Sequence, residues 1–388
     1  MIINRKLTDI IKQSKKSVLL LGPRQTGKST LIKSLKPDLS INLARESTFL
    51  EFASNPNSLD EQILSMKPKT AFIDEVQRLP SLLNTVQALI DESHGGLKFY
   101  LTGSSARKLR RGRANLLPGR ILSLELGPLT TEELGEKFDL NRALSEGTLP
   151  GIVTEPDTAE RERILRSYAG TYLQEEVQAE ALTKDLPGFA RFLRFCAASS
   201  GQYLDLSRLA AEAQVKRASA IRFCEILEDT LIAFRCEAFA KSERRRLIQH
   251  PRLFFFDNGA LNGILGNFKV SEDRRGMLFE HFVTTQVYHT AKSLGGSARI
   301  SNYRTEHGAE LDLIVEHPNG ELVAVECKSG HTVTSSDMQG FKSFATFFNK
   351  PHRKIVIYGG ATARRIEDVE ILPCEEGLRA VFASSITS

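Results

Sequence analysis

The segment from Gly22 to Ser29 has the residue types and spacing that bind a phosphate tail. Glycines let a loop turn its N–H groups inward, and the following helix points its positive end at the anion. Lys28 is expected to reach the β- and γ-phosphates, and Ser29 to hold Mg²⁺. An apolar run at 18–21 precedes the loop, which argues against a simple glycine turn. The predicted ATP contacts are Gly22, Arg24, Gln25, Thr26, Gly27, Lys28, Ser29 and Thr30.

Small polar and acidic residues follow two further apolar segments. Asp74 and Glu75 end the segment 70–73, and we expect Asp74 to bind Mg²⁺ and Glu75 to act as the base that polarises water. Ser104 follows 98–102 and is expected to sense the γ-phosphate. The alternatives are a solvated acidic pair and a helix N-cap at Ser104, and a cap can coexist with a sensor.

Arginines come shortly after Ser104. A neighbouring subunit can supply an arginine that neutralises charge on the transferred phosphoryl group. Arg120, just before the apolar segment 121–126, is the candidate for this role, and Arg113 is the weaker candidate. A solvated basic loop is the alternative. Arg120 in this role implies a homo-oligomer.

A second group of charged residues lies near the C-terminus. Glu310 and Asp312 alternate with apolar residues in one expected strand, and Glu326 and Lys328 do so in the next. A three-residue turn, 318–320, sets Asp312 opposite Glu326 and gathers all four charged side chains on one face.

This group resembles the PD-(D/E)xK nuclease motif. The resemblance implies that Asp312 and Glu326 bind Mg²⁺ or Mn²⁺ and that Lys328 orients or deprotonates the attacking water. Glu280, in the helical stretch 276–282, is a further carboxylate candidate, and Glu310 adds another metal ligand. The alternative is a charged, solvated face of a sheet.

Between these sites the pattern predicts helices at 206–213 and 218–233, in a helix-turn-helix arrangement. The apolar stretches 231–239 and 253–256 then predict a two-stranded wing with a basic tip at 241–246. Arg217, Arg222 and the tip can contact DNA phosphates, but such a winged helix can equally serve as a packing lid.

The motifs Gly-Pro-Arg-Gln-Thr-Gly-Lys-Ser-Thr, Phe-Ile-Asp-Glu-Val-Gln-Arg-Leu-Pro, Leu-Thr-Gly-Ser-Ser and Pro-Gly-Arg resemble a prokaryotic AAA-type ATPase family. Its members carry a C-terminal domain of unknown function that resembles restriction endonucleases. The resemblance implies an α/β fold in three parts: a P-loop AAA-type ATPase domain (1–145), a helical region with a winged helix (146–260) and a PD-(D/E)xK nuclease-like domain (261–388).

Length and composition limit the classes of protein to which this chain can belong. The chain has 388 residues, 41% hydrophobic and 26% charged, as in ordinary globular proteins of two or three domains. No apolar run of about 18 residues predicts a membrane span, and the start of the chain does not read as a signal peptide, so we expect a cytoplasmic protein. Five scattered cysteines argue against disulfides and structural zinc. A net charge of +5 permits DNA as a partner without requiring it.

Two hypotheses of different class follow. In the first, ATP binding and hydrolysis license metal-dependent cleavage of DNA by the C-terminal domain. In the second, the protein is a nucleotide-switched DNA- or partner-binding protein whose nuclease-like domain does not cleave. A transcriptional signalling ATPase is a third and less supported interpretation.

Overall fold

The computed structural model describes residues 3–104, 119–168, 170, 185–239, 250–296 and 298–383. Contacts divide the chain into two compact units. The first comprises Met1–Gly127 with Asp229–Ile232 and Lys292–Gly296, and the second comprises Pro128–Glu228, Ala233–Ala291 and Ser297–Ser388. The predicted division into three domains, with boundaries at 145 and 260, stays a prediction.

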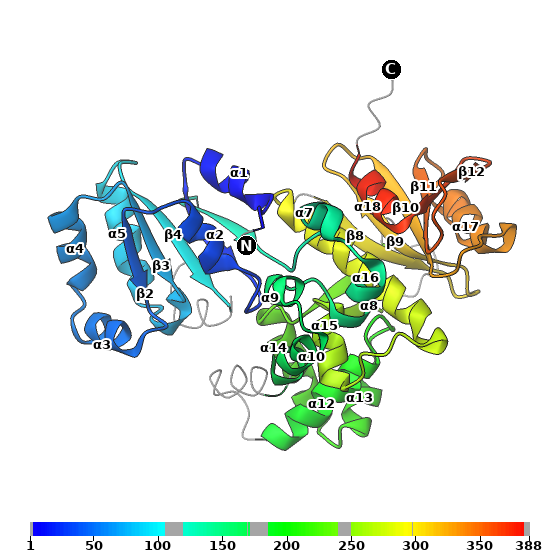
Figure 1. Cartoon of the computed structure of the whole chain (residues 1–388), viewed down its shortest axis with the longest axis horizontal. Coiled ribbons are helices and arrows are strands. Elements are labelled where there is room, and N and C mark those ends of the chain that lie inside the picture. The colour runs from blue at the N-terminus through cyan, green and yellow to red at the C-terminus, as the bar shows by residue number, and fades with distance from the viewer. Residues whose placement is uncertain are drawn as a thin grey trace. The chain divides into compact units, whose positions relative to one another are not determined.

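The first unit is built on a parallel sheet of five strands in the order β2-β3-β4-β1-β5, drawn from blue to cyan in Figure 1. The strands are β1 (Ser17–Leu21), β2 (Leu39–Asn42), β3 (Thr70–Asp74), β4 (Lys98–Gly103) and β5 (Ile121–Glu125). The helices are α1 (Leu7–Gln13), α2 (Lys28–Ser34), α3 (Glu46–Ser54), α4 (Ser58–Met66) and α5 (Leu82–Glu92), with a 3-10 turn at Val76–Arg78. The apolar segments noted in the sequence at 18–21, 70–73, 98–102 and 121–126 form β1, β3, β4 and β5.

Alternation along β1 separates two cores. Leu19 and Leu21 pack with residues of α3, α4 and α5, whereas Val18 and Leu20 pack with residues of α1 and α2. Both faces of the sheet are therefore covered, as expected for a parallel sheet whose strands are continuous apolar runs. The carboxyl ends of β1, β3 and β4 meet at one edge, where the loops after them carry the candidate ATP residues.

The second unit contains a mixed sheet in the order β12-β13-β11-β10-β9-β8-β6-β7. Its strands are β6 (Ala233–Ala238), β7 (Arg252–Phe255), β8 (Arg299–Arg304), β9 (Glu310–Glu316), β10 (Leu322–Lys328), β11 (Arg353–Tyr358), β12 (Arg364–Ile366) and β13 (Val369–Pro373). Phe341 and Phe344 of α17 (Gln339–Phe348) pack on the sheet with Ile314 and Ala324. Strands β9 and β10, which carry the charged motif, are thus held in the middle of a packed layer.

Helices make up much of the rest of the second unit (Figure 1). They are α7 (Thr131–Leu134), α8 (Leu140–Glu146), α9 (Pro150–Thr154), α10 (Thr158–Ser167), α12 (Leu186–Ala198), α13 (Leu206–Glu212), α14 (Arg217–Asp229), α15 (Asn258–Leu265), α16 (Glu272–Ser293) and α18 (Cys374–Phe382). In the described part of this unit, 3-10 turns lie at Gly135–Lys137 and Ser335–Met338. Among the described residues, none of the helices combines the length and the apolar composition needed to cross a membrane.

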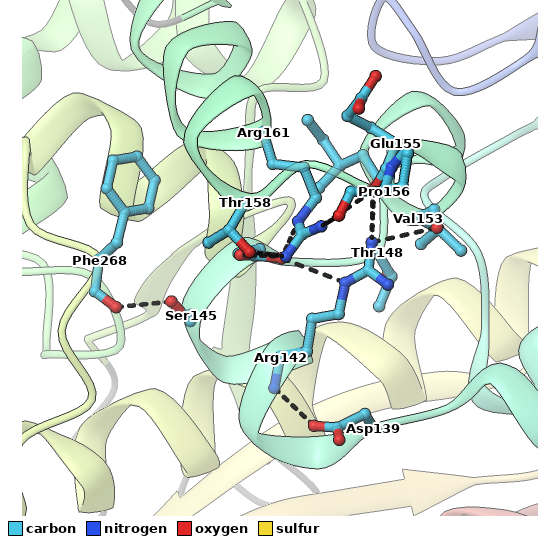
Figure 2. A network of polar contacts seen from close by, with 12 residues as sticks. Asp139, Arg142, Ser145, Thr148, Val153, Glu155, Pro156, Thr158, Arg161 and Phe268 are labelled. Carbon is cyan, nitrogen blue, oxygen red and sulfur yellow. Dashed lines mark hydrogen bonds and ion pairs between the residues drawn. The ribbon is translucent and has the colours of Figure 1, made fainter.

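A buried ion network joins α8 to α10. Arg161 binds both carboxylate oxygens of Glu146, at 2.6 and 3.1 Å, and Arg142 approaches the same carboxylate at 3.2 Å. Figure 2 shows the two guanidinium groups converging, with further hydrogen bonds to backbone carbonyls of α9 and of the α9–α10 connection. Glu146 is thus fully compensated by two arginines.

The middle segment differs from the sequence prediction in one helix. The helix predicted at 218–233 ends at Asp229, because Leu231 adopts a left-handed φ of 61° that turns the chain into β6. The two strands predicted for the wing do pair antiparallel, from Ala233 opposite Phe255 to Cys236 opposite Arg252. They are also part of the large sheet, since β6 pairs in parallel with β8. The winged helix stays a prediction, and its basic tip at 241–246 lies outside the described residues.

Candidate functional site

The loop between β1 and α2 is shaped by two glycines. Gly27 has a φ of 91°, a left-handed conformation that glycine adopts readily, and it immediately precedes Lys28 at the start of α2. A Cβ atom on Gly22 would lie 2.2 Å from the carbonyl oxygen of Leu126, so the loop passes too close to the backbone for a larger residue. The chain thus reaches the positive end of a helix through a close-packed glycine loop.

Side chains hold this loop in place. Lys28 is 5% exposed and donates from Nζ to the carbonyl oxygens of Gly22 and Pro23, both at 2.9 Å. Arg5, which the sequence analysis did not single out, donates to the carbonyls of Thr26 at 2.7 Å and Gly127 at 2.8 Å. An arginine in an N-terminal amphipathic segment carries no signal of this role. Arg5 holds the loop only because folding brings Thr26 and Gly127 next to it.

The side-chain oxygens of Ser29 and Asp74 meet where α2 begins and β3 ends. Ser29 donates from Oγ to Asp74 Oδ1 at 2.7 Å, and Thr102 donates to the same oxygen at 2.5 Å. Asp74 is 5% exposed, and its described side-chain partners are these two hydroxyl groups. Hydroxyl and carboxylate oxygens are the ligands that Mg²⁺ prefers, so Ser29 and Asp74 fit that ion.

Glu75 and Ser104, the predicted base and sensor, are linked by a residue that the sequence analysis did not assign. The amide of Gln77 donates to Glu75 Oε2 and, at 3.0 Å, to Ser104 Oγ. Glu75 has a left-handed φ of 59°, a strained conformation for a non-glycine residue. Gln77 follows the Asp-Glu pair by two positions, and this spacing is the only signal in the sequence that pointed to it.

The other predicted residues of this unit have fewer contacts. Gln25 and Thr30 are exposed, and Arg24 is half-buried. Arg120 is ion-paired with Asp91 at 2.5 Å, and this neighbour raises the pKa of Arg120. Arg113 and Ser105 lie outside the described residues. The structure therefore brings together the loop, Ser29, Asp74, Glu75 and Ser104, while the role of Arg120 stays a prediction.

The β9–β10 hairpin has the register predicted from the sequence. Leu322 lies opposite Glu316 and Val325 opposite Leu313, and His317 bonds to Glu321 across a three-residue turn. Gly320 closes the turn with a φ of 84°. Next to Asp312 the pairing of β9 with β8 shifts, and Asp312 accepts a hydrogen bond from the backbone N–H of Cys327 at 2.8 Å.

Each predicted metal-binding carboxylate of this unit has a basic partner. Arg252 donates to Glu280 and lies 3.8 Å from Asp312, and Lys328 lies 2.9 Å from Glu326. Arg304 lies 3.6 Å from Glu310. We call the four acids Glu280, Glu310, Asp312 and Glu326 the carboxylate cluster. Its three basic partners neutralise most of its charge.

Burial disfavours the charged forms of two members of the cluster. It raises the pKa of Glu326 to about 7, although Lys328 acts in the opposite direction. Burial, together with Glu280 and Glu326, raises the pKa of Asp312 well above its ordinary range. Both acids therefore hold their protons to a higher pH than exposed carboxyl groups do.

The C-terminal metal site expected from the sequence stays a prediction. Among the described residues, no three His, Cys, Asp or Glu side chains are positioned to hold a metal ion. Arg252 contacts both Glu280 and Asp312, so it competes with a metal ion for these two acids. Arg252 was not predicted to belong to this site. It directly precedes the apolar stretch 253–256, so it reads as the first residue of an expected strand.

On the helix-turn-helix segment, Arg217 and Arg222 of α14 are exposed. Arg217 donates to Ser207 at 3.3 Å. The side chains that the sequence analysis assigned to phosphate contact are thus on the surface of α14, where a backbone phosphate can reach them.

Three family models match consecutive parts of the chain. Residues 14–135 match a family described as an AAA domain. Residues 137–271 match a domain of unknown function (DUF8612), and residues 275–376 match a second one (DUF4143). The first match and the loop geometry together support an AAA-type P-loop ATPase in the N-terminal unit. The other two matches assign no activity.

Similar proteins occur in several organisms. An uncharacterized protein of Mycobacterium tuberculosis is 27% identical over 308 residues, which cover 77% of this chain and 67% of that protein. One of Methanocaldococcus jannaschii is 23% identical over 374 residues, covering 88% of this chain and 81% of that protein. A solved structure of the replication initiator DnaA bound to AMPPCP and single-stranded DNA is 12% identical, covers 57% of this chain and 86% of that chain, and has a TM-score of 0.28. A TM-score of that size supports no inference.

Proposed function

We propose that the protein binds and hydrolyses ATP at the loop between β1 and α2. Lys28 contacts the terminal phosphates, Ser29 and Asp74 hold Mg²⁺, and Glu75 acts as the base on the attacking water. The ion would neutralise charge on the phosphates during transfer. Gln77 orients Glu75 and Ser104 relative to each other, and Arg120 acts across a subunit interface in a cytoplasmic homo-oligomer.

For the second unit we propose nucleic-acid binding without cleavage, switched by the nucleotide state of the first. The observation that carries this choice is Arg252, whose guanidinium group contacts both Glu280 and Asp312. A nuclease of this type needs those acids for its metal, and the guanidinium group of Arg252 competes with a metal for them. Exposed arginines on α14 supply phosphate contacts.

Metal-dependent cleavage of DNA, licensed by ATP, is the second candidate. The hairpin register favours it, since Glu326 and Lys328 form a pair at 2.9 Å next to Asp312, as the PD-(D/E)xK pattern requires. For cleavage with Mg²⁺ or Mn²⁺, Glu280 and Asp312 would first have to lose Arg252 as their partner.

The ATPase proposal is tested by phosphate release from the wild type, Lys28→Ala and Glu75→Gln. We expect Lys28→Ala to lose turnover, and Glu75→Gln to bind ATP without hydrolysing it. Lys33→Ala is the control, because Lys33 is an exposed lysine of the same helix. Equal turnover in Lys28→Ala and Lys33→Ala would refute the proposal.

Cleavage and binding are separated on plasmid, linear and single-stranded DNA with Mg²⁺ or Mn²⁺, with and without ATP. We expect retention of DNA and no nicking. Nicking that is lost in Lys328→Ala, and kept in the control Lys342→Ala on the exposed side of α17, would establish the second candidate instead. Absence of both retention and nicking would leave only the ATPase proposal standing.

A further inference from the structure

A pocket of about 560 Å³ opens beside the carboxylate cluster, entirely within the second unit. Its lining combines an aromatic ring with paired donors and acceptors, and it lies within the size range of small-ligand pockets. Residues that line it include Gln202, Tyr203, Arg252, Phe254, Arg304 and Glu310. None of the functions discussed so far uses Tyr203 or Arg304.

Tyr203 and Arg304 lie against each other in this pocket. The guanidinium carbon of Arg304 lies 5.0 Å from the centre of the Tyr203 ring, and that of Arg252 lies 5.9 Å from it. Nε of Arg304 is buried and has no hydrogen-bond partner among the described residues. Stacked tyrosine and arginine planes are the surfaces on which proteins bind unpaired bases.

The charge of the lining selects against an anion. Two guanidinium groups face three carboxylates, those of Glu280, Glu310 and Asp312. Both guanidinium groups are already paired with carboxylates, so the lining offers a phosphate no surplus positive charge. A neutral planar group that both donates and accepts hydrogen bonds suits the adjacent Arg304 and Glu310, which lie 3.6 Å apart.

We propose that this pocket binds one unpaired base of a single-stranded nucleic acid, stacked against Tyr203 and Arg304. The inference rests on the proposed nucleic-acid binding and adds to it a preference for single strands over duplex. In a duplex the base is paired and stacked, so it enters only after being extruded at a cost in free energy. Phosphate contacts come from arginines outside the pocket.

The test uses the full-length chain and a short single-stranded oligonucleotide with one 2-aminopurine, compared with its duplex. Binding is measured with Mg-ATP, with Mg-ADP and without nucleotide. We expect Tyr203→Ala and Arg304→Ala to weaken single-strand binding by about tenfold or more and to remove the fluorescence change of 2-aminopurine. Tyr203→Phe keeps the ring and should retain both.

Arg364→Ala is the matched control. Arg364 also stacks on a tyrosine, at 5.8 Å from the ring of Tyr358, and it does not line this pocket. Equal losses in Arg304→Ala and Arg364→Ala would overturn the inference, because they would reflect net charge alone. Wild-type binding of duplex only, or of free nucleosides but not oligonucleotides, would also overturn it. Failure to bind any nucleic acid would overturn the proposed function itself.

Discussion

The carboxylates of the loop site in the first unit and those of the carboxylate cluster in the second have different partners. In the first unit, the described partners of Asp74 are the hydroxyl groups of Ser29 and Thr102. In the second, Glu280, Glu310, Asp312 and Glu326 each lie beside an arginine or a lysine. A hydroxyl leaves the charge of a carboxylate available to a metal, whereas a guanidinium group cancels it. The presence of acids in a motif therefore says less about metal chemistry than the groups opposite them.

Glu146 shows how much a buried carboxylate paired with arginines contributes to the free energy of unfolding. Glu146→Gln removes the charge that compensates Arg161 and Arg142, and we expect the free energy of unfolding to fall by about 3–5 kcal/mol. Urea denaturation measures this change. Glu212→Gln is the control, since its pair with Arg208 at 2.9 Å is exposed and is expected to contribute less than about 1 kcal/mol. Similar losses of stability in both variants would show that burial does not strengthen the ion pairs of Glu146.

Asp74→Asn and Asp312→Asn test the contrast directly. We expect ATP turnover to fall roughly 10²- to 10³-fold in Asp74→Asn, because the metal loses a charged ligand. Asp312→Asn should stay within about twofold of the wild type, since its described partners, Arg252 and the N–H of Cys327, belong to the second unit. Phosphate release at several Mg²⁺ concentrations measures both. A large loss of turnover in Asp312→Asn would remove the distinction between the two sites.

Asp257 is a buried carboxylate whose described partners are backbone N–H groups, those of Thr148 at 2.8 Å and Ala260 at 3.0 Å among them. Burial raises its pKa to about 6. The unfolded chain gives up this proton near pH 4, before the folded chain does, so stability falls as the pH rises. We expect a loss of about 3 kcal/mol between about pH 4 and pH 6, with no further change above.

Denaturation at a series of pH values measures that slope. Asp257→Asn should flatten it, while lowering stability at pH 4 because one N–H loses its acceptor. Asp205→Asn is the control, because Asp205 also caps a helix but is exposed. An unchanged slope in Asp257→Asn would mean that the pH dependence arises elsewhere.

Arg252→Met tests whether the basic partner is what excludes a metal. Without the guanidinium group, Glu280 and Asp312 would be uncompensated, and Mn²⁺ should stabilise the variant by about 1.4 kcal/mol at tenfold excess over its dissociation constant. Thermal unfolding with and without Mn²⁺ measures the difference within one variant, so a lower starting stability does not obscure it. Arg252→Lys keeps the charge and should not respond. A response of the wild type would contradict the account of the cluster given above.

Local patterns account for what could be predicted. The strand, glycine loop and helix around Lys28 are contiguous, and so is the hairpin whose turn at 318–320 fixes its own register. The end of α14 was misjudged because Leu231 takes a left-handed conformation that its residue type does not suggest. Gln77 was within reach, since it stands two positions after Glu75.

By itself, the sequence determined the phosphate-binding loop, the strand ends that carry Asp74 and Ser104, and the register that aligns β9 with β10. Each depends on neighbouring residues and on short-range backbone geometry. Only the tertiary structure decided the electrostatic state of the C-terminal acids, because Arg252, Glu280 and Asp312 come from β7, α16 and β9. Charges separated by 28 to 60 positions in the chain meet only when the sheet and its helix have packed, and no local pattern records that meeting.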